Sequence, residues 1–103
     1  MQVDPGQSSP ALTGSQRKFL RGRAHRLEPV VLVGQAGASD AVIAAVDQAL
    51  LDHELIKVRL RVGDRDAREA ALAALCAGTG AACAGRVGHV AILYRPHPEH
   101  PRL

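Results

Sequence analysis

The stretch VVLVGQAGASDAV, residues 30–42, predicts a strand, a glycine loop and the start of a helix in immediate succession. Its unbroken apolar run favours a strand buried on both faces, and Ser39 is a suitable helix N-cap. Between them lies the GQAG loop, residues 34–37. Such a loop presents backbone N–H groups at the helix N-terminus, where an anion can bind. The two glycines are equally compatible with a simple turn, because glycine readily adopts positive φ angles.

Upstream of this stretch, residues 13–26 predict a helix that begins at an N-cap, Thr13 or Ser15. Its inward positions at helical spacing are Leu20, Ala24 and Leu27. Basic side chains fall within an arc of about 100° beside that apolar stripe; they are Arg17, Lys18, Arg21 and His25. Because residues 17–26 contain no acid, one flank of this helix is predicted to be cationic.

Downstream, Ser39 opens a helix that ends near His53, and ELIKVRLRV, residues 54–62, follows it. Apolar residues alternate there with Lys57, Arg59 and Arg61, which predicts a half-buried strand. The three cations stand on one face at intervals of about 6.6 Å. Alternation alone requires polar residues on that face, but three successive cations exceed what solubility requires.

The remaining residues predict a third helix and two short strands. Asp64 or Asp66 caps the helix, residues 78–80 end it, and the strands are residues 82–87 and 89–95 around a hairpin at Gly88. The apolar side of the helix is predicted to contain Ala70, Leu72, Ala73 and Leu75. The order is therefore α-β-α-β-α-β-β, an α/β (α+β two-layer) fold whose mixed four-stranded sheet has its first two strands parallel and its last two antiparallel.

Composition limits the classes of protein to which the chain can belong. Its 103 residues suffice for one domain, which we place at residues 12–96 between flexible tails at residues 1–11 and 97–103. No apolar run or signal segment suggests a membrane span or secretion, so we expect a cytoplasmic protein. Without a secretion signal, Cys76 and Cys83 are interpreted as reduced, partly buried thiols. The formal net charge of +3 is compatible with a polyanionic partner.

Enzyme motifs are missing from the sequence. The GQAG loop lacks the lysine and hydroxyl of a phosphate-hydrolysing P-loop, and only two of the three glycines of a dinucleotide fingerprint can be placed. The histidines and cysteines lack the spacing of a zinc site. Asp64 and Asp66 are better explained as helix caps than as catalytic acids. We therefore expect no catalysis, no cofactor, no metal and no small-molecule substrate.

Three strings, in this order and spacing, resemble a known family: LTGSQRKFLRGRAHRLEPVVLVGQAGAS, HELIKVRLRV and GHVAILYRP. They are similar to the CRM domain, the chloroplast RNA-splicing and ribosome-maturation module, in its stand-alone bacterial YhbY-like form. The resemblance spans residues 12–96. It implies a fold similar to the C-terminal domain of a bacterial translation initiation factor, RNA binding, and association with precursors of the large ribosomal subunit.

The resemblance also implies an RNA-binding surface, because the family's GxxG loop is compared with the loop of KH domains. Carried onto this sequence, and with Arg95 of the last string added, the predicted RNA-binding residues are Arg17, Lys18, Arg21, Gly34, Gln35, Ala36, Gly37, Lys57, Arg59, Arg61 and Arg95. Only Phe19 and Tyr94 are aromatic, so recognition of RNA shape is expected rather than of base sequence. The alternative is a protein-interaction module whose basic face docks an acidic partner.

Overall fold

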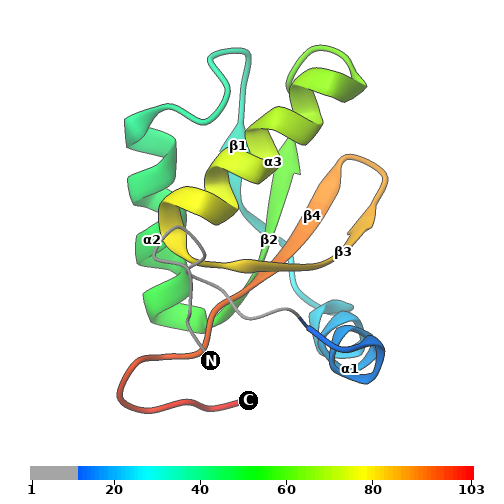
Figure 1. Ribbon diagram of the computed structural model, residues 1–103, viewed down its shortest axis with the longest axis vertical. Helices are drawn as coiled ribbons and strands as arrows, with labels where there is room; N and C mark the ends of the chain where they lie inside the picture. The colour runs from blue at the N-terminus through cyan, green and yellow to red at the C-terminus, as the bar shows by residue number, and fades with distance from the viewer. Residues whose placement is uncertain (1–11) are drawn as a thin grey trace, which may run out of the picture.

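Within residues 12–103, the part of the chain that the computed structural model describes, the helices and strands follow the predicted order (Figure 1). Their bounds are α1 Gly14–Ala24, β1 Pro29–Val33, α2 Asp40–His53, β2 Leu55–Leu60, α3 Arg65–Thr79, β3 Ala82–Val87 and β4 Val90–Tyr94. The α+β fold class is confirmed. The predicted tail at residues 1–11 lies outside the described residues.

Local side-chain chemistry fixes where the helices begin. Thr13 and Gln16 form a capping box, in which the Thr13 hydroxyl accepts from the Gln16 N–H at 3.1 Å and the Gln16 amide oxygen accepts from the Thr13 N–H at 2.9 Å. Ser39 caps α2 and Asp64 caps α3 through the same kind of bond to the backbone three residues on. Gly80, with φ 78°, ends α3 in the left-handed conformation that glycine tolerates.

The sheet is mixed and has the strand order β1-β2-β4-β3. Strand β1 runs parallel to β2, while β4 is antiparallel to both β2 and β3. The β3–β4 hairpin turns at Gly88, whose φ is 60°. The predicted pairing of strands is therefore confirmed, and β1 and β3 are the edge strands.

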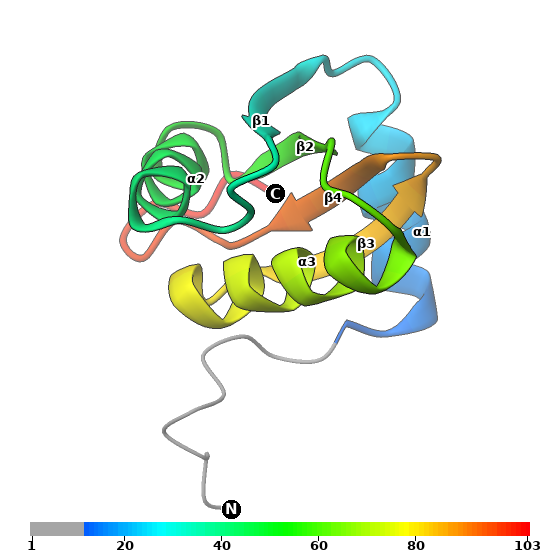
Figure 2. The same ribbon diagram turned by 90° about the horizontal axis from the view of Figure 1, so that it is seen from above.

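Helices cover the two faces of the sheet unequally (Figure 2). On one face, α2 and α3 pack on the sheet around Val46, Leu50, Leu75, Val58 and Leu93, all fully buried. On the other face, α1 contributes a smaller cluster, made of Leu20 and Ala24 against Leu55, Ala84 and Ile92. Helix α1 lies mainly against β3, with fewer contacts to β2 and β4. The sheet therefore carries helices on both sides, but α1 reaches only part of its face.

The prediction that β1 is buried on both faces is wrong. Val30 is 51% exposed and Leu32 is 54% exposed, whereas Val33 is fully buried. Strand β1 lies at one edge of the sheet, and α1 packs toward the opposite edge, so α2 covers β1 from one side only. Leu27, predicted to face inward, is also more exposed than expected, because α1 ends at Ala24.

The apolar side of α3 was only partly predicted. Leu72 and Leu75 are buried as expected, but Ala70 and Ala73 are exposed, and the remaining buried positions of this helix are Ala71 and Thr79. Helix α3 is rich in alanine, so its sequence of apolar residues is compatible with burial of either of two adjacent faces. Packing selects the face that buries both leucines, because a leucine removes far more apolar surface from water than an alanine does.

A buried carboxylate holds the chain that follows β4. Glu54 is fully buried between α2 and β2, and its side chain accepts hydrogen bonds from the N–H groups of His97 at 2.7 Å and Arg102 at 2.8 Å. Burial raises the pKa of Glu54, but these donors and the Arg102 guanidinium outweigh it and leave the pKa below its ordinary value. Residues 97–103, predicted as a flexible tail, are thus held at the C-terminal end of α2. Glu54, which holds them, is predicted from the sequence as the first residue of a strand.

Replacing Glu54 with glutamine is expected to lower the free energy of unfolding by about 2 kcal/mol at pH 7. Glutamine is uncharged and has one side-chain oxygen, so it cannot accept from the His97 and Arg102 N–H groups as the two carboxylate oxygens do. Because folding lowers the pKa of Glu54, its contribution is present above the ordinary value of 4.5 and is lost as the pH falls through the folded-state pKa. Urea denaturation of both proteins from pH 7 to pH 3 should show their stabilities converging below about pH 4.5. A constant difference across this range would contradict the assignment.

Candidate nucleic-acid interface

The GQAG loop forms a tight turn between β1 and α2 (Figure 1). The Gly37 N–H donates to the Gly34 carbonyl at 2.9 Å, and the Ser39 N–H donates to the Gly37 carbonyl at 2.9 Å. Gly37 has φ 71° and is required by the turn, whereas a Cβ on Gly34 would have no heavy atom within 4 Å. The fold therefore explains the second glycine but not the first. Gln35 and Ala36, at the tip, are exposed.

A hollow of about 300 Å³ lies beside this loop. It is lined by Gln35, Arg59, Leu60, Arg61, Val62, Gly63, Arg68 and His89, which come from the GQAG loop, the end of β2, the β2–α3 connection, α3 and the β3–β4 hairpin. None of these described lining residues is acidic. Three arginines and a histidine thus line a space that has no acidic residue in its lining, which is an arrangement suited to a phosphate.

Hydrogen bonds hold the parts of this hollow together. The Gln35 side-chain amide donates to the Arg61 carbonyl at 3.3 Å, which joins the loop to β2. The Leu60 N–H donates to the His89 carbonyl at 2.6 Å, which joins β2 to the hairpin. Arg68 donates to the Gly63 carbonyl at 3.1 Å and so is held near the mouth. The cations are therefore carried on a connected backbone frame rather than on separate loops.

The basic side chains of β2, Lys57 and Arg59, face the side of the sheet on which α1 lies, and Arg61 directly follows the strand. Lys57 pairs in register with Ile92, whose side chain belongs to the α1 cluster, and cross-strand partners point to the same face. Lys57 is half-buried, and Arg59 and Arg61 are exposed. Helix α1 brings Arg21 to the same face, because the stem of Arg21 lies across Gly85 of β3, where a Cβ would approach its Cδ to 2.7 Å.

The structure does not bring every predicted residue to the GQAG loop. Arg17 and Lys18 are exposed one turn before Arg21 on α1, and Arg17 donates to the Leu12 carbonyl at 2.8 Å. They extend the basic surface along the helix without lining the hollow. Their role in RNA binding stays a prediction, as it does for the other residues of this surface.

Arg95 lies in a different environment from the rest of the predicted set. Its guanidinium donates to the Asp47 carboxylate at 2.6 Å, the Thr79 carbonyl at 2.6 Å and the Asp47 carbonyl at 3.1 Å. These bonds join β4 to α2 and to the end of α3, and the side chain is only 19% exposed. A guanidinium engaged in this way has few donors left for a phosphate, so we leave Arg95 out of the interface proposed below.

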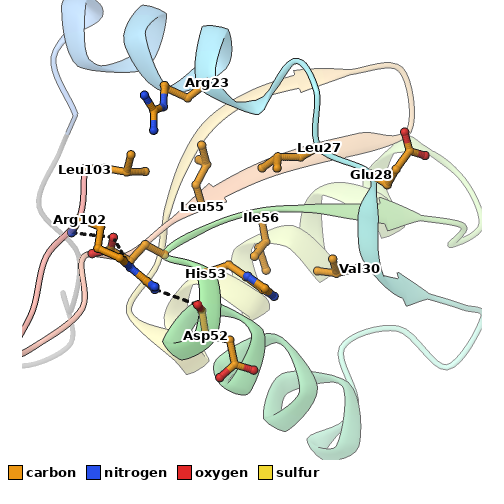
Figure 3. A pocket seen from close by; sticks show the side chains of 11 residues that line it. Arg23, Leu27, Glu28, Val30, Asp52, His53, Leu55, Ile56, Arg102 and Leu103 are labelled. Carbon is orange, nitrogen blue, oxygen red and sulfur yellow. Dashed lines mark hydrogen bonds and ion pairs between the residues drawn. The ribbon is translucent and has the colours of Figure 1, made fainter.

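A larger hollow, of about 460 Å³, lies at the opposite end of β2 (Figure 3). Its floor is apolar, with Leu27, Val30, Leu55 and Ile56, and Leu103 lies at its rim. Its charges are mixed: Arg23, Arg102 and His53 stand with Glu28, Asp52 and the buried Glu54. Because acids accompany the bases, this hollow does not offer a phosphate the uniformly positive surroundings found beside the GQAG loop.

The described residues give little support to nucleophilic catalysis by a thiol or to metal binding. Cys76 and Cys83 are free and half-buried. Burial, and to a smaller extent Cys83, raises the pKa of Cys76 to about 11, and burial also raises the pKa of Cys83. Both thiols are therefore protonated at neutral pH, the form that is a poor nucleophile. Within residues 12–103, no three His, Cys, Asp or Glu side chains gather as a metal site would require, and no helix there could span a membrane.

Comparison with known proteins decides the family. A family model described as the CRS1 / YhbY (CRM) domain matches residues 12–95. The chain belongs to the CRM-domain family. Over 88 residues it is 41% identical to a protein of Haemophilus influenzae named "RNA-binding protein", covering 85% of this chain and 89% of the relative. It is 40% identical over 89 residues, 86% of each chain, to a Pseudomonas aeruginosa protein named as a probable RNA-binding protein.

The fold of this CRM domain is also found in a solved structure. A hypothetical protein of Staphylococcus aureus, determined in solution and suggested to bind RNA, superposes with a TM-score of 0.75 at 29% identity. The match covers 86% of this chain and 93% of the other. The resemblance to the CRM family inferred from the sequence is therefore confirmed.

The sequence-based prediction of the site does not include Arg68, which is assigned there only to a helix. His89, after the hairpin glycine, is expected from the family resemblance to contribute less to RNA affinity than the lysine or arginine of relatives, and it lines the hollow beside the GQAG loop. The sequence contains a topological signal for the position of Arg68. Because β1 and β2 are parallel, the segments that follow the two strands meet at the same end of the sheet. That rule places the β2–α3 connection and the first turn of α3, which contains Arg68, beside the GQAG loop.

Proposed function

We propose that this CRM-domain protein is a non-enzymatic, cytoplasmic RNA-binding factor that binds ribosomal RNA in precursors of the large subunit. The observation that supports this proposal most strongly is the hollow at the GQAG loop. It is lined by Arg59, Arg61 and Arg68, lies beside the N-terminus of α2, and has no acidic residue in its lining. The names of the two relatives described above, one an RNA-binding protein and the other a probable RNA-binding protein, support this partner.

In this proposal the sugar-phosphate backbone of an RNA helix packs against the GQAG loop. Gly34 has no neighbour that would exclude a side chain, so its lack of one leaves space for the approaching backbone. Arg59 and Arg61 neutralise phosphates at the loop, and Lys57, Arg21, Lys18 and Arg17 continue the positive surface across the sheet and along α1. Neither residue at the loop tip is charged, so the cations of β2 supply most of the attraction.

The test is sedimentation of tagged protein with ribosomal particles from gently lysed cells at low and moderate salt. We expect the wild type to peak with large-subunit precursors and to dissociate as salt rises, because each neutralised phosphate releases counterions. Gly34→Ala should lose most of this association while keeping its stability, because the added methyl meets nothing within the protein.

Gly22→Ala is the matched control, because it adds the same methyl to α1 where no atom lies within 4 Å. It should sediment as the wild type does. Migration of the wild type with free protein at every salt concentration would contradict the ribosomal assignment. Retention of an acidic protein partner by the wild type in that case would instead favour an interaction module.

A further inference from the structure

One row of side chains on the α1 face of the sheet is left uncovered. Strand register places Leu32 beside Arg59, Arg59 beside Val90, and Val90 beside Val87, so the row crosses all four strands. Val87 is 68% exposed and Leu32 is 54% exposed. We name Leu32, Val87 and Val90 the apolar band; Arg59 lies in its middle.

Helix α1 stops short of the apolar band. The rows that it covers contain Leu55 and Ile92, and its Arg21 lies over Gly85, in register with Ile92. The apolar band is the next row toward the GQAG loop. Leu32 and Val87 therefore stay exposed at the two ends of the apolar band, with Arg59 and the half-exposed Val90 between them. Exposed apolar surface that adjoins charged side chains is typical of a binding site.

The apolar band is continuous with the hollow at the GQAG loop. Arg59 and Arg61 line that hollow and also line a second one, of about 380 Å³, together with residues 29–32 of β1. An RNA that places a phosphate at the loop therefore has its neighbouring nucleotide over β1 and β2. The two surfaces share their cations, so one ligand can occupy both.

The chemistry of the apolar band differs from that of a surface for duplex RNA alone. An A-form helix presents phosphates and 2′-hydroxyls, which pair with cations but gain nothing from valine or leucine. An unpaired base presents a flat face that buries apolar surface and can lie against a guanidinium plane. An acidic peptide would match the cations as well, but the shared arginines tie the band to the loop where the RNA backbone is placed.

We propose that the apolar band receives the base of an unpaired nucleotide adjoining the RNA helix held at the GQAG loop. This inference rests on the proposed function, and it specifies the RNA: a helix with a single-stranded extension or bulge rather than a blunt helix. Arg59 would contact this nucleotide from the centre of the apolar band, and Arg61 its phosphate.

The test compares two fluorescent RNA hairpins, one blunt and one carrying a four-nucleotide unpaired extension, by anisotropy titration at fixed salt. The variant is Leu32→Thr/Val87→Thr, which places threonine, a β-branched residue that strands favour, at both exposed strand positions and removes apolar surface. Leu27→Thr/Leu103→Thr, at two exposed leucines of the larger hollow (Figure 3), is the matched control.

We expect the wild type and the control to bind the extended hairpin about fivefold more tightly than the blunt one, the effect of removing roughly 40 Å² of apolar surface from water. The double variant should lose this preference and bind the blunt hairpin as the wild type does. Equal binding of both hairpins by the wild type, or an unchanged preference in the variant, would overturn the inference while leaving RNA binding intact. Failure of the wild type to bind either hairpin would overturn the proposed function as well.

Discussion

Replacing both Arg59 and Arg61 with alanine will weaken binding to an RNA hairpin roughly 50-fold at 0.1 M salt and reduce the slope of log K against log salt by about two. Each phosphate contact contributes about 0.9 to that slope, so two lost contacts correspond to this change in affinity. Both side chains are exposed on the surface beside the GQAG loop, so their removal leaves the core unchanged. Titrations at four or more salt concentrations give the affinity and the slope together.

The control for this prediction is Arg26→Ala/Arg65→Ala. It removes two charges from exposed positions that do not line the hollow, and it gives the same net charge as the first variant. If the interface is local, the control retains most of the affinity and of the slope. Equal losses in the two variants would show that only the total charge matters, and that the hollow has no special role.

The order of the elements was predictable because each element contains its own local signal. Thr13, Ser39 and Asp64 are caps whose bonds depend only on residues three positions away, and the alternation in ELIKVRLRV defines a half-buried strand. The exposure of β1 was not predictable in this way. A run of four apolar residues looks the same in a central strand and in an edge strand, and only the placement of α1 over β3 decides between them.

The candidate site shows the same division between local and long-range information. The GQAG loop and the cations of β2 are visible in the sequence, because glycine spacing and alternation are local. Arg68 and His89 reach the hollow only through the meeting of three connections at one end of the sheet. Arg95 shows the reverse: its charge suggested RNA contact, but Asp47 and Thr79, far away in sequence, engage it. Charge alone does not distinguish a surface cation from one that joins two helices.

We therefore expect Arg95→Ala to act on stability and not on RNA binding. Its removal leaves the Thr79 carbonyl and the Asp47 carboxylate without their shared donor, and the free energy of unfolding should fall by about 3 kcal/mol, which is roughly a hundredfold in the equilibrium constant. Urea denaturation measures this loss. Titration of the hairpin at a temperature where the variant remains folded should give an affinity within about twofold of the wild type, since one missing surface charge outside the interface has little effect.

Arg95→Lys separates the two roles more sharply, because lysine keeps the charge but cannot reproduce the divergent donors of a guanidinium. If Arg95 joins β4 to α2 and α3, the lysine variant is destabilised nearly as much as the alanine variant and binds RNA normally. If Arg95 instead contacts phosphate, the lysine variant retains both stability and affinity, and the alanine variant loses RNA affinity with a salt slope lower by about one. The second pattern would return Arg95 to the interface and show that its bonds to Asp47 and Thr79 contribute little to the fold.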